Sequence, residues 1–504
     1  MNVLLPLMVT VPLGAGFLLA LMPEKFVKTA DTVAIVVSGA ILTGALALLG
    51  REESYEIGGW APPVGINLSL DGLSALLLVV VALVAFTSIL YSVGYMKLYT
   101  SRARYCALSM IMLAGMNGVL LSGDIFNRFV YVEVAAIASY VLVGFGCGTE
   151  ELKAALKYAV LGALASAITL LGIALLYVLH GTVNIAHLYE KIAAAGPVNL
   201  TASVVSMSAL LFFVGFVFKS ALVPLHIWQP DVMKAAPAPV SAMISGALIE
   251  VIGVYAMVRI AFSVFGVTPQ LGWLMACLGM LSMVAGVVIS MRQNDMRRFL
   301  AYQSISHIGY VFAAFGIGGV LTARGGAAWP ASLALMGGVL HLANHAIFQS
   351  LLFLNAGAVE YETAGEPDAS PSNARAFSSP VTAAAWYAGA LSSAALPPFG
   401  GCVSKAMIIA AFLMSGHYLP AAVAIVVAVL AIVSFLKYHG KGRQFRGGSL
   451  PPADRKIPLM MAMALVLLML LSLGMSLLAL GPLRGLVLEP AQASMVNVER
   501  GQHQ

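Results

Sequence analysis

Charged residues are scarce in this sequence. Asp, Glu, Lys and Arg together make up 10% of the 504 residues, whereas a soluble globular domain carries about 25%. Hydrophobic residues make up 60%, and the mean hydropathy is +0.94. A chain this apolar cannot cover its surface with polar groups, so the composition excludes a soluble globule and indicates an integral membrane protein.

Cysteine is also rare, and the four cysteines are isolated from one another. Cys106, Cys147, Cys277 and Cys402 show no C-x-x-C spacing and have no histidine neighbour at zinc-finger distance. The sequence therefore offers no ligand set for an iron–sulfur cluster, and no motif marks a haem, flavin or other cofactor-binding site. We expect the four side chains to pack in helices as small apolar residues.

Motifs of processing and of catalysis are missing too. The apolar segment that follows Met1 lacks a basic leader and a small-residue cleavage site, so we expect a retained helix and not a signal peptide. No nucleophile motif, metal site or nucleotide loop is visible. We expect that the chain binds no cofactor itself and is not catalytic alone.

Long apolar runs divide the chain into fourteen segments of the length that a membrane-spanning helix needs, about 20 residues. They lie at 3–22, 31–50, 72–93, 105–123, 127–146, 154–180, 202–225, 239–263, 270–291, 299–320, 331–357, 380–412, 419–436 and 457–482. The predicted fold class is all-α: a polytopic membrane protein with about 14 transmembrane helices.

The basic residues predict how the chain lies across the membrane. Of the 27 lysines and arginines, 18 fall in loops after odd-numbered segments and seven after even-numbered segments or in the C-terminal tail; Lys219 and Lys405 lie inside segments. Basic residues accumulate in cytoplasmic loops. We therefore expect a multi-pass protein of a prokaryotic-type cytoplasmic membrane with both termini outside, and the net charge of +6 does not indicate nucleic-acid binding.

Four ionisable side chains lie inside these apolar runs: Glu133, Lys219, Glu250 and Lys405. Each such charge costs roughly 2.5 to 3.5 kcal/mol at the centre of a spanning helix, so several together indicate a route for protons or other ions.

Two of the predicted segments contain helix-breaking prolines near a lysine. FKSALVPLHIWQPD (218–231) contains Pro224, and ALPPFGGCVSKA (395–406) contains Pro397 and Pro398. A helix can break at membrane depth only where protein or a water-filled cavity receives the freed backbone groups, and such breaks mark sites in transporters. A proline kink that serves packing alone is the alternative for each segment.

The order of the segments suggests a duplicated unit. Segments four to eight (105–263) and nine to thirteen (264–436) each have a broken helix in fourth place, and SALVPL (220–225) is echoed by SAALPPF (393–399). Five spans per unit make the two copies face opposite ways, as in inverted-repeat transporters. An N-terminal three-helix segment (1–104) precedes them, and a basic cytoplasmic loop, a final helix and an outer tail (437–504) follow.

Three histidines lie within the later segments. His341 and His345 are four residues apart and therefore share a helix face with Gln349, and His307 lies in the preceding segment. Histidine suits reversible protonation, so these residues are candidate relay groups, or alternatively hydrogen-bonded structural residues. The sequence places no carboxylate near the pair, and we expect no metal there.

Seven stretches, in order along the chain, resemble those of a known family. They are FNRFVYVEVAAIASYVLV (126–143), LKAALKYAVLGA (152–163), FKSALVPLHIWQPD (218–231), KAAPAPVSAMISGALIEVIGVYAMVR (234–259), NDMRRFLAYQSISHIGYV (294–311), HLANHAIFQSLLFLNAG (341–357) and ALPPFGGCVSKA (395–406). They resemble the antiporter-like membrane subunits shared by respiratory complex I (NADH-quinone oxidoreductase), Mrp-type cation/proton antiporters (their D-type subunits) and group 4 membrane-bound hydrogenases. The resemblance implies fourteen helices with two inverted five-helix repeats, and a row of titratable residues and water along the middle of the membrane.

The resemblance also implies roles for individual residues. Glu133 matches the family's acidic residue and Lys219 its partner lysine, which stays charged while the carboxylate is near and releases its proton when the two separate. Lys405 matches the ionisable residue nearest the outer exit. Two positions depart from the pattern, because Glu250 and Gln349 stand where relatives often have lysine. Gln349 cannot titrate, and Glu250 reverses the local charge, which could alter the path or favour a cation such as Na⁺.

Two further residues lie toward the cytoplasmic side. His226 fits the family's pattern just after Pro224 and is a candidate for proton uptake, or it simply caps the break. Lys157 either extends to the interface or couples to Glu133. Asp124 and Arg128 flank a tight turn, which we expect them to anchor.

Three functions remain open. The first is a proton-translocating subunit of a redox-driven complex, either complex I-like or an energy-converting hydrogenase, with iron–sulfur, flavin or nickel centres in partner subunits and oxidoreductase activity in the assembly. The second is an Mrp-type Na⁺/H⁺ antiporter subunit without redox input. The third is a structural spacer that does not pump. All three predict other membrane subunits as partners.

Overall fold

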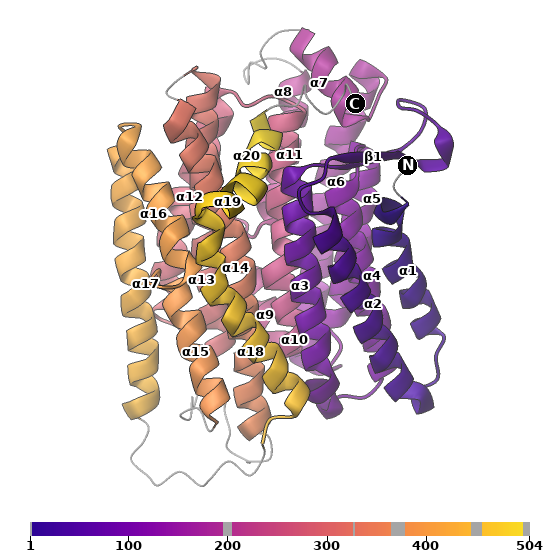
Figure 1. The fold of residues 1–504 in the computed structure, drawn as a ribbon, viewed down its shortest axis with the longest axis vertical. Coiled ribbons are helices and arrows are strands. Elements are labelled where there is room, and N and C mark those ends of the chain that lie inside the picture. The colour runs from indigo at the N-terminus through magenta and orange to yellow at the C-terminus, as the bar shows by residue number, and fades with distance from the viewer. Residues whose placement is uncertain (1–2, 195–203, 326–327, 364–378, 445–455, 497–504) are drawn as a thin grey trace.

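The computed structural model describes residues 3–194, 204–325, 328–363, 379–444 and 456–496. These residues form a bundle of helices that run along one common direction (Figure 1). The only strands among them form a short antiparallel hairpin of β1 (Glu53–Glu56) and β2 (Asn67–Leu70). Part of the predicted basic loop (445–455) and the end of the predicted tail (497–504) lie outside the described residues.

The first half of the chain contains the helices up to residue 263. They are α1 (Leu4–Ala20), α2 (Val27–Leu48), α3 (Gly72–Tyr95), α4 (Arg102–Leu121), α5 (Ile125–Val143), α6 (Thr149–His180), α7 (Ile185–Ala194), α8 (Val204–Lys219), α9 (Gln229–Ala235), α10 (Ala238–Met243), the π-helix η4 (Ile244–Tyr255) and α11 (Ala256–Ser263). Short 3-10 turns η1 (Glu24–Phe26), η2 (Ile57–Gly59) and η3 (Met96–Leu98) lie between them.

The second half contains the remaining helices. They are α12 (Pro269–Ser290), α13 (Met296–Ala323), α14 (Ala328–Thr363), α15 (Pro380–Ser393), α16 (Gly400–Met414), α17 (Tyr418–Gln444), α18 (Leu459–Gly474), the 3-10 turn η5 (Met475–Ala479), α19 (Gly481–Leu483), the π-turn η6 (Arg484–Leu488) and α20 (Glu489–Val496).

The predicted all-α membrane fold is confirmed. Eleven helices in the described part of the chain are long and apolar enough to cross a membrane, and α1, α8 and α16 are shorter apolar helices. Each of the fourteen predicted segments overlaps one of the helices above. The count of fourteen spans stays a prediction, because three of those helices are shorter than a full crossing requires.

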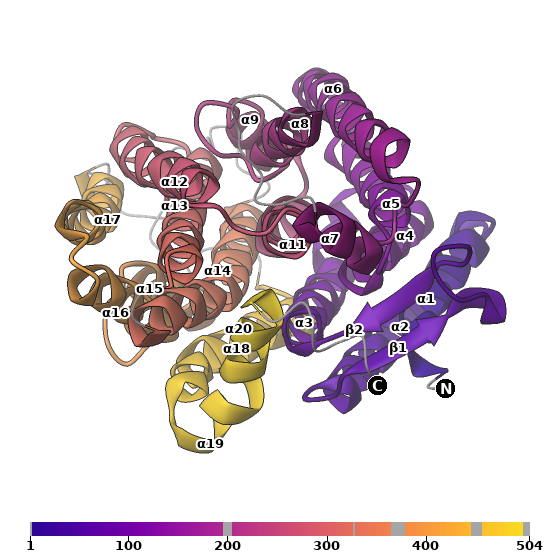
Figure 2. The same cartoon turned by 90° about the horizontal axis from the view of Figure 1, so that it is seen from above.

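The view from above shows how the helices are distributed. The helices α4, α5, α6 and α8 lie on one side of the molecule, and α12, α13, α15, α16 and α17 lie on the other (Figure 2). The helices α11 and α14 lie between the two groups, and α1 and α2 with the β-hairpin flank the first group. In Figure 1, α1 begins and α20 ends near the same end of the bundle as β1 and α7.

Both predicted helix breaks are present, and their backbones match. The chain leaves α8 at Lys219 and α15 at Ser393 in the same way: Ala221 N donates to Phe218 O and Ala395 N to Ser392 O. Leu222 N then reaches Val217 O at 3.1 Å, and Leu396 N reaches Leu391 O at 2.9 Å. Ala221 and Ala395 both adopt a left-handed conformation, with φ of 54° and 60°. These turns satisfy carbonyls at the ends of the interrupted helices, which a break at membrane depth requires.

Glycine lets α12 and α13 approach closely. A Cβ on Gly279 would lie 2.5 Å from the backbone nitrogen of Ala313, and a Cβ on Gly309 would lie 2.6 Å from the carbonyl oxygen of Gly279. Small residues at such contacts let membrane helices gain dispersion energy along their backbones. This contact joins α12 and α13, which lie side by side in the group with α15, α16 and α17 in Figure 2.

The expectation for the cysteines was wrong in part. Cys106 is buried in α4, but Cys277 is exposed on α12, Cys402 in α16 is only partly buried, and Cys147 is exposed in the turn after α5. An apolar side chain on a spanning helix can face lipid as well as protein, so hydrophobicity alone does not predict burial here. The β-hairpin and α7 were not predicted.

Candidate functional site

The first group of buried ionisable residues is formed by α5, α6 and α8. Lys219 Nζ lies 3.2 Å from Glu133 Oε1 and donates to Ser166 Oγ at 2.9 Å. Ser166 in turn donates to the same Glu133 oxygen. Lys219 is the last residue of α8, so the break that follows places its ammonium beside the carboxylate of the neighbouring helix. The three side chains form a closed triangle in which the serine contacts both charged groups.

Glu133 differs from the other members of this group in its exposure. Its side chain is 24% exposed, compared with 3% for Lys219. On the same face of α5, Val130 is 41% and Ile137 57% exposed. The carboxylate therefore lies at the rim of the bundle, within an apolar stripe that points away from the protein interior.

The second carboxylate, Glu250, pairs with a histidine. Glu250 Oε1 lies 2.7 Å from His345 Nδ1, and the two side chains are 1% and 0% exposed. Glu250 lies within η4, a stretch of π-helix, and such stretches are frequent at functional sites. The prediction that no carboxylate lies near the histidine pair was wrong, because the two residues are 95 positions apart and meet only when η4 packs on α14.

The histidines form a connected group with two serines. His307 Nδ1 lies 3.2 Å from His341 Nε2, and His307 Nε2 lies 2.7 Å from Ser393 Oγ. His341 Nδ1 lies 2.9 Å from Ser404 Oγ. The ring of His345 is 5.7 Å from that of His307, between centroids, so the Glu250 pair joins this group by ring packing. All of these side chains are buried.

Lys405 lies at the end of the row in the second half. Its Nζ donates to the carbonyl oxygen of Ser393 at 2.9 Å and lies 4.8 Å from the centre of the Tyr310 ring. The side chain is 2% exposed and forms no ion pair within the described ranges. Its charge is therefore met by a carbonyl and by the face of an aromatic ring.

The row is not continuous through direct contacts. No hydrogen bond between described residues joins Lys219 to Glu250. The helices that carry them are nevertheless in contact, because a Cβ on Gly253 would lie 2.6 Å from Ser220. Ser220 is fully buried and its hydroxyl has no hydrogen-bond partner. Ser220, the residue directly after Lys219, thus places a polar side chain at the contact with η4.

Gln349 is also buried, but its hydrogen bond is to a backbone carbonyl and not to the histidines. Its amide nitrogen donates to the Leu300 carbonyl at 2.8 Å, while its amide oxygen has no partner. It shares a face of α14 with His341 and His345, as the spacing predicted.

Lys157 and His226 lie on the α9 side of the row. Among the described residues, neither forms a hydrogen bond or an ion pair with Glu133. Lys157 pairs with Asp231 on α9 at 2.7 Å, and Arg298 of α13 pairs with the same aspartate at 2.9 Å. His226 is partly buried and packs against Tyr302, with ring centroids 6.2 Å apart. Asp231 thereby ties the segment after the first break to both α6 and α13.

Several of these groups could not be found from the sequence. Ser166, Ser393, Ser404 and Tyr310 contact the titratable side chains, but serine and tyrosine are common in spanning helices and carry no motif here. In the part of the chain that the structure describes, no three His, Cys, Asp or Glu side chains are grouped to hold a metal ion.

Comparison with known proteins points to one family. Residues 122–431 match the family model described as NADH:quinone oxidoreductase/Mrp antiporter, TM, and residues 60–106 match the model for the N-terminus of complex I chain 5. NADH-quinone oxidoreductase subunit N of Desulforudis audaxviator is 33% identical over 489 residues, covering 94% of this chain and 91% of that protein. The D subunit of the Na⁺/H⁺ antiporter of Alkalihalophilus pseudofirmus is 31% identical, covering 86% and 85%.

Solved structures agree with these relatives. A chain of the Mrp complex of a Dietzia species superposes with a TM-score of 0.83 at 28% identity, covering 100% of this chain and 98% of that one. A chain of an archaeal membrane-bound sulfane sulfur reductase superposes with a TM-score of 0.84 at 27% identity, covering 99% and 98%. The first is described as a complex, and the second as an archaeal respiratory membrane complex.

The fold and the buried polar row define the class: this is an antiporter-like membrane subunit of the kind found in complex I, Mrp and membrane-bound reductase complexes. The chain belongs to the NADH:quinone oxidoreductase/Mrp antiporter family of membrane proteins.

Proposed function

We propose that this chain translocates protons as a subunit of a redox-driven membrane complex. The observation that carries the proposal is the buried run of contacts from Glu250 through His345, His307 and His341 to Ser404. Each member can hold or pass a proton, and each is at most 1% exposed. Burying a polar run of this kind in a membrane protein costs free energy, so its presence indicates a function.

The Glu133–Lys219 pair acts as the switch at the other end. While the carboxylate contacts the ammonium, the charged lysine is stabilised, and separation of the two removes that stabilisation. Ser166 contacts both groups and orients them. Movement of the unwound segment after Lys219 changes this contact and releases the proton toward η4. At the far end Lys405, which contacts a carbonyl and a ring, takes up and gives off the proton on the way to the outer side.

Neighbouring membrane subunits complete the site. Because the Glu133 carboxylate is 24% exposed within an apolar stripe, lipid alone would leave it poorly solvated. We propose that another membrane subunit covers this face of α5. Peripheral subunits with iron–sulfur, flavin or nickel centres supply the redox reaction, since the relative with 33% identity is named a subunit of NADH-quinone oxidoreductase.

The chain lies in a prokaryotic-type cytoplasmic membrane with both ends outside. The support is the 18 to seven distribution of basic residues and the placement of the start of α1 and the end of α20 at the same end of the bundle. Labelling of single cysteines, placed at Arg51 for the outer side and at Lys97 for the inner side, tests this orientation.

Two inverted repeats, 105–263 and 264–436, hold the row. The matching turns after Lys219 and Ser393, 174 residues apart, support the duplication. If the proposal is right, the two ranges superpose after inversion with these turns in register.

Charge movement in reconstituted vesicles tests the function. Lys219→Ala and Glu133→Ala should each abolish proton movement by the assembled complex, whereas Lys153→Ala should not, because Lys153 is exposed and pairs with the exposed Glu150. Full pumping by assembled complexes that carry Lys219→Ala or Glu133→Ala would reject a relay and leave the structural-spacer function.

The second candidate is an Mrp-type antiporter subunit. It is favoured by the relative named as the D subunit of a Na⁺/H⁺ antiporter and by the Mrp complex structure. Co-purification separates the two candidates: redox subunits support the first, and only small membrane subunits with Na⁺-dependent proton exchange in vesicles support the second.

A further inference from the structure

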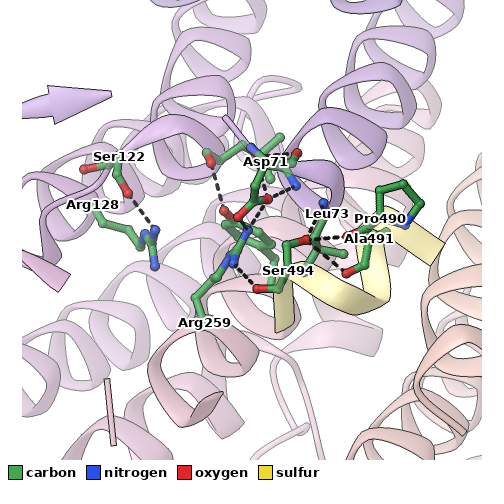
Figure 3. A network of polar contacts seen from close by, with 11 residues as sticks. Asp71, Leu73, Ser122, Arg128, Arg259, Pro490, Ala491 and Ser494 are labelled. Atoms are coloured by element: carbon green, nitrogen blue, oxygen red, sulfur yellow. Dashed lines mark hydrogen bonds and ion pairs between the residues drawn. The ribbon is translucent and has the colours of Figure 1, made fainter. Parts of the chain in front are cut away.

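Arg128 is a buried cation that the proton row does not use. It lies in the first turn of α5, and the residue is 4% exposed. Its Nη2 donates to the carbonyl oxygen of Ser122 at 2.6 Å, which is its single dashed contact in Figure 3. Its Nε and Nη1 have no hydrogen-bond partner, and Arg128 forms no ion pair among the described residues. Buried polar groups are nearly always paired, so two orphaned donors on a buried guanidinium need an explanation.

The nearest carboxylates are already engaged. Asp71 forms an ion pair with Arg259 through both carboxylate oxygens, and Arg259 also donates to the carbonyl oxygen of Ser494 on α20 at 3.1 Å. Asp124, at the N-cap of α5, accepts from Asn127 N at 2.7 Å. The Asp124 carboxylate forms no ion pair with Arg128 among the described residues.

Arg128 and Arg259 are brought together by one aromatic ring. The two guanidinium carbons lie 5.5 and 5.2 Å from the centre of the Tyr255 ring. Figure 3 shows Arg128 extending from α5 toward the Asp71–Arg259 pair. Two guanidinium groups therefore share one ring, and of the two only Arg259 has a carboxylate at ion-pair distance among the described residues.

We propose that a small monovalent inorganic anion of the chloride class binds here, at a free donor of Arg128 beside Tyr255 and Arg259. A single guanidinium without an ion-pair partner favours a monovalent ion. The burial of Arg128 selects a small one, because a lipid phosphate or a partner's carboxylate would need an opening that a 4% exposed residue does not offer. The bound anion accepts from one of the two orphaned donors, lowers the repulsion between the two guanidiniums, and holds α5 against η4 and α11.

Thermal unfolding of the full chain purified in detergent tests the site. At constant ionic strength, replacing gluconate with chloride should raise Tm by about 1 to 2 °C in a saturable way, since a ligand that binds only the folded state stabilises it. Bromide should act like chloride. Arg128→Leu should abolish the anion-dependent shift, and Arg128→Lys should retain part of it.

A matched control is Arg51→Gln, because Arg51 is 59% exposed and should leave the shift unchanged. If the unmodified chain shows no saturable shift, the free donors bind water only and the proposal is overturned. That measurement stands even if the Arg128 variants fail to fold. A shift of equal size in Arg128→Leu and in the unmodified chain would be a general salt effect and would also overturn it.

Discussion

Glu250 and His345 form a fully buried carboxylate–imidazole pair, with Oε1 and Nδ1 2.7 Å apart, between the π-helix η4 and α14. The pair links the position at which the family resemblance leads us to expect lysine to the row of histidines. Under the proposed function, a carboxylate at this position keeps a proton-exchanging group in the row, because the histidine beside it can share the proton.

Glu250→Gln should stop proton movement without preventing folding. Glutamine keeps the shape and a hydrogen bond to His345 but cannot exchange a proton, so we expect pumping in vesicles to fall about tenfold or more and stability to change by about 1 kcal/mol. His345→Gln should have the same effect, and the double variant should be no worse than either, since both changes break one link. Unchanged pumping in Glu250→Gln would show that the path bypasses the pair.

Ser166→Ala should weaken the Glu133–Lys219 switch. The hydroxyl accepts from Lys219 at 2.9 Å and donates to Glu133, so its loss should cost about 1 kcal/mol of stability and slow charge movement in vesicles. Ser38→Ala is the matched control, because Ser38 is also buried and, among the described residues, bonds to carbonyls of its own helix. Equal pumping rates in the two variants would remove Ser166 from the switch.

Asp71 should make stability depend on pH. Burial opposes its charge, but the Arg259 guanidinium and the hydrogen bonds from Ser74 outweigh this and hold the pKa of Asp71 below its usual 3.8. The stabilisation is therefore complete at neutral pH and is lost as pH falls through the lowered pKa. Asp71→Asn keeps the N-cap but leaves Arg259 unpaired, and should cost about 3 kcal/mol at pH 7.

Thermal unfolding between about pH 3 and pH 7 measures this dependence. The difference in stability between the unmodified chain and Asp71→Asn should be constant near neutrality and shrink only at the acid end. A difference that is already small at pH 7 would mean that the ion pair contributes little.

Gly309→Ala should loosen the contact between α12 and α13. The added Cβ would lie 2.6 Å from two backbone atoms of α12, which cannot move aside cheaply, so we expect a loss of about 1 to 3 kcal/mol in thermal or denaturant unfolding. Gly14→Ala is the control: nothing lies within 4 Å of its Cβ position, and alanine in mid-helix should stabilise α1 by about 0.5 to 1 kcal/mol. Similar effects at the two sites would argue against a close helix contact.

The sequence by itself determined that this is a helical membrane protein, and it located the ionisable residues within the spans. Hydropathy is a local property, and a bilayer imposes a fixed helix length, so the segments and both breaks could be predicted from composition and proline alone. The ordered motifs added the family, which the comparisons bear out.

Only the tertiary structure decided which polar groups meet. Glu250 contacts His345, Ser166 contacts Lys219 and Asp71 contacts Arg259 across 95, 53 and 188 positions of sequence. Such partners depend on the rotation and depth of each helix, which are set by side-chain packing and by close contacts such as that at Gly309. These contacts are long-range, and a hydropathy pattern that is apolar all round a helix does not say which face turns toward which neighbour.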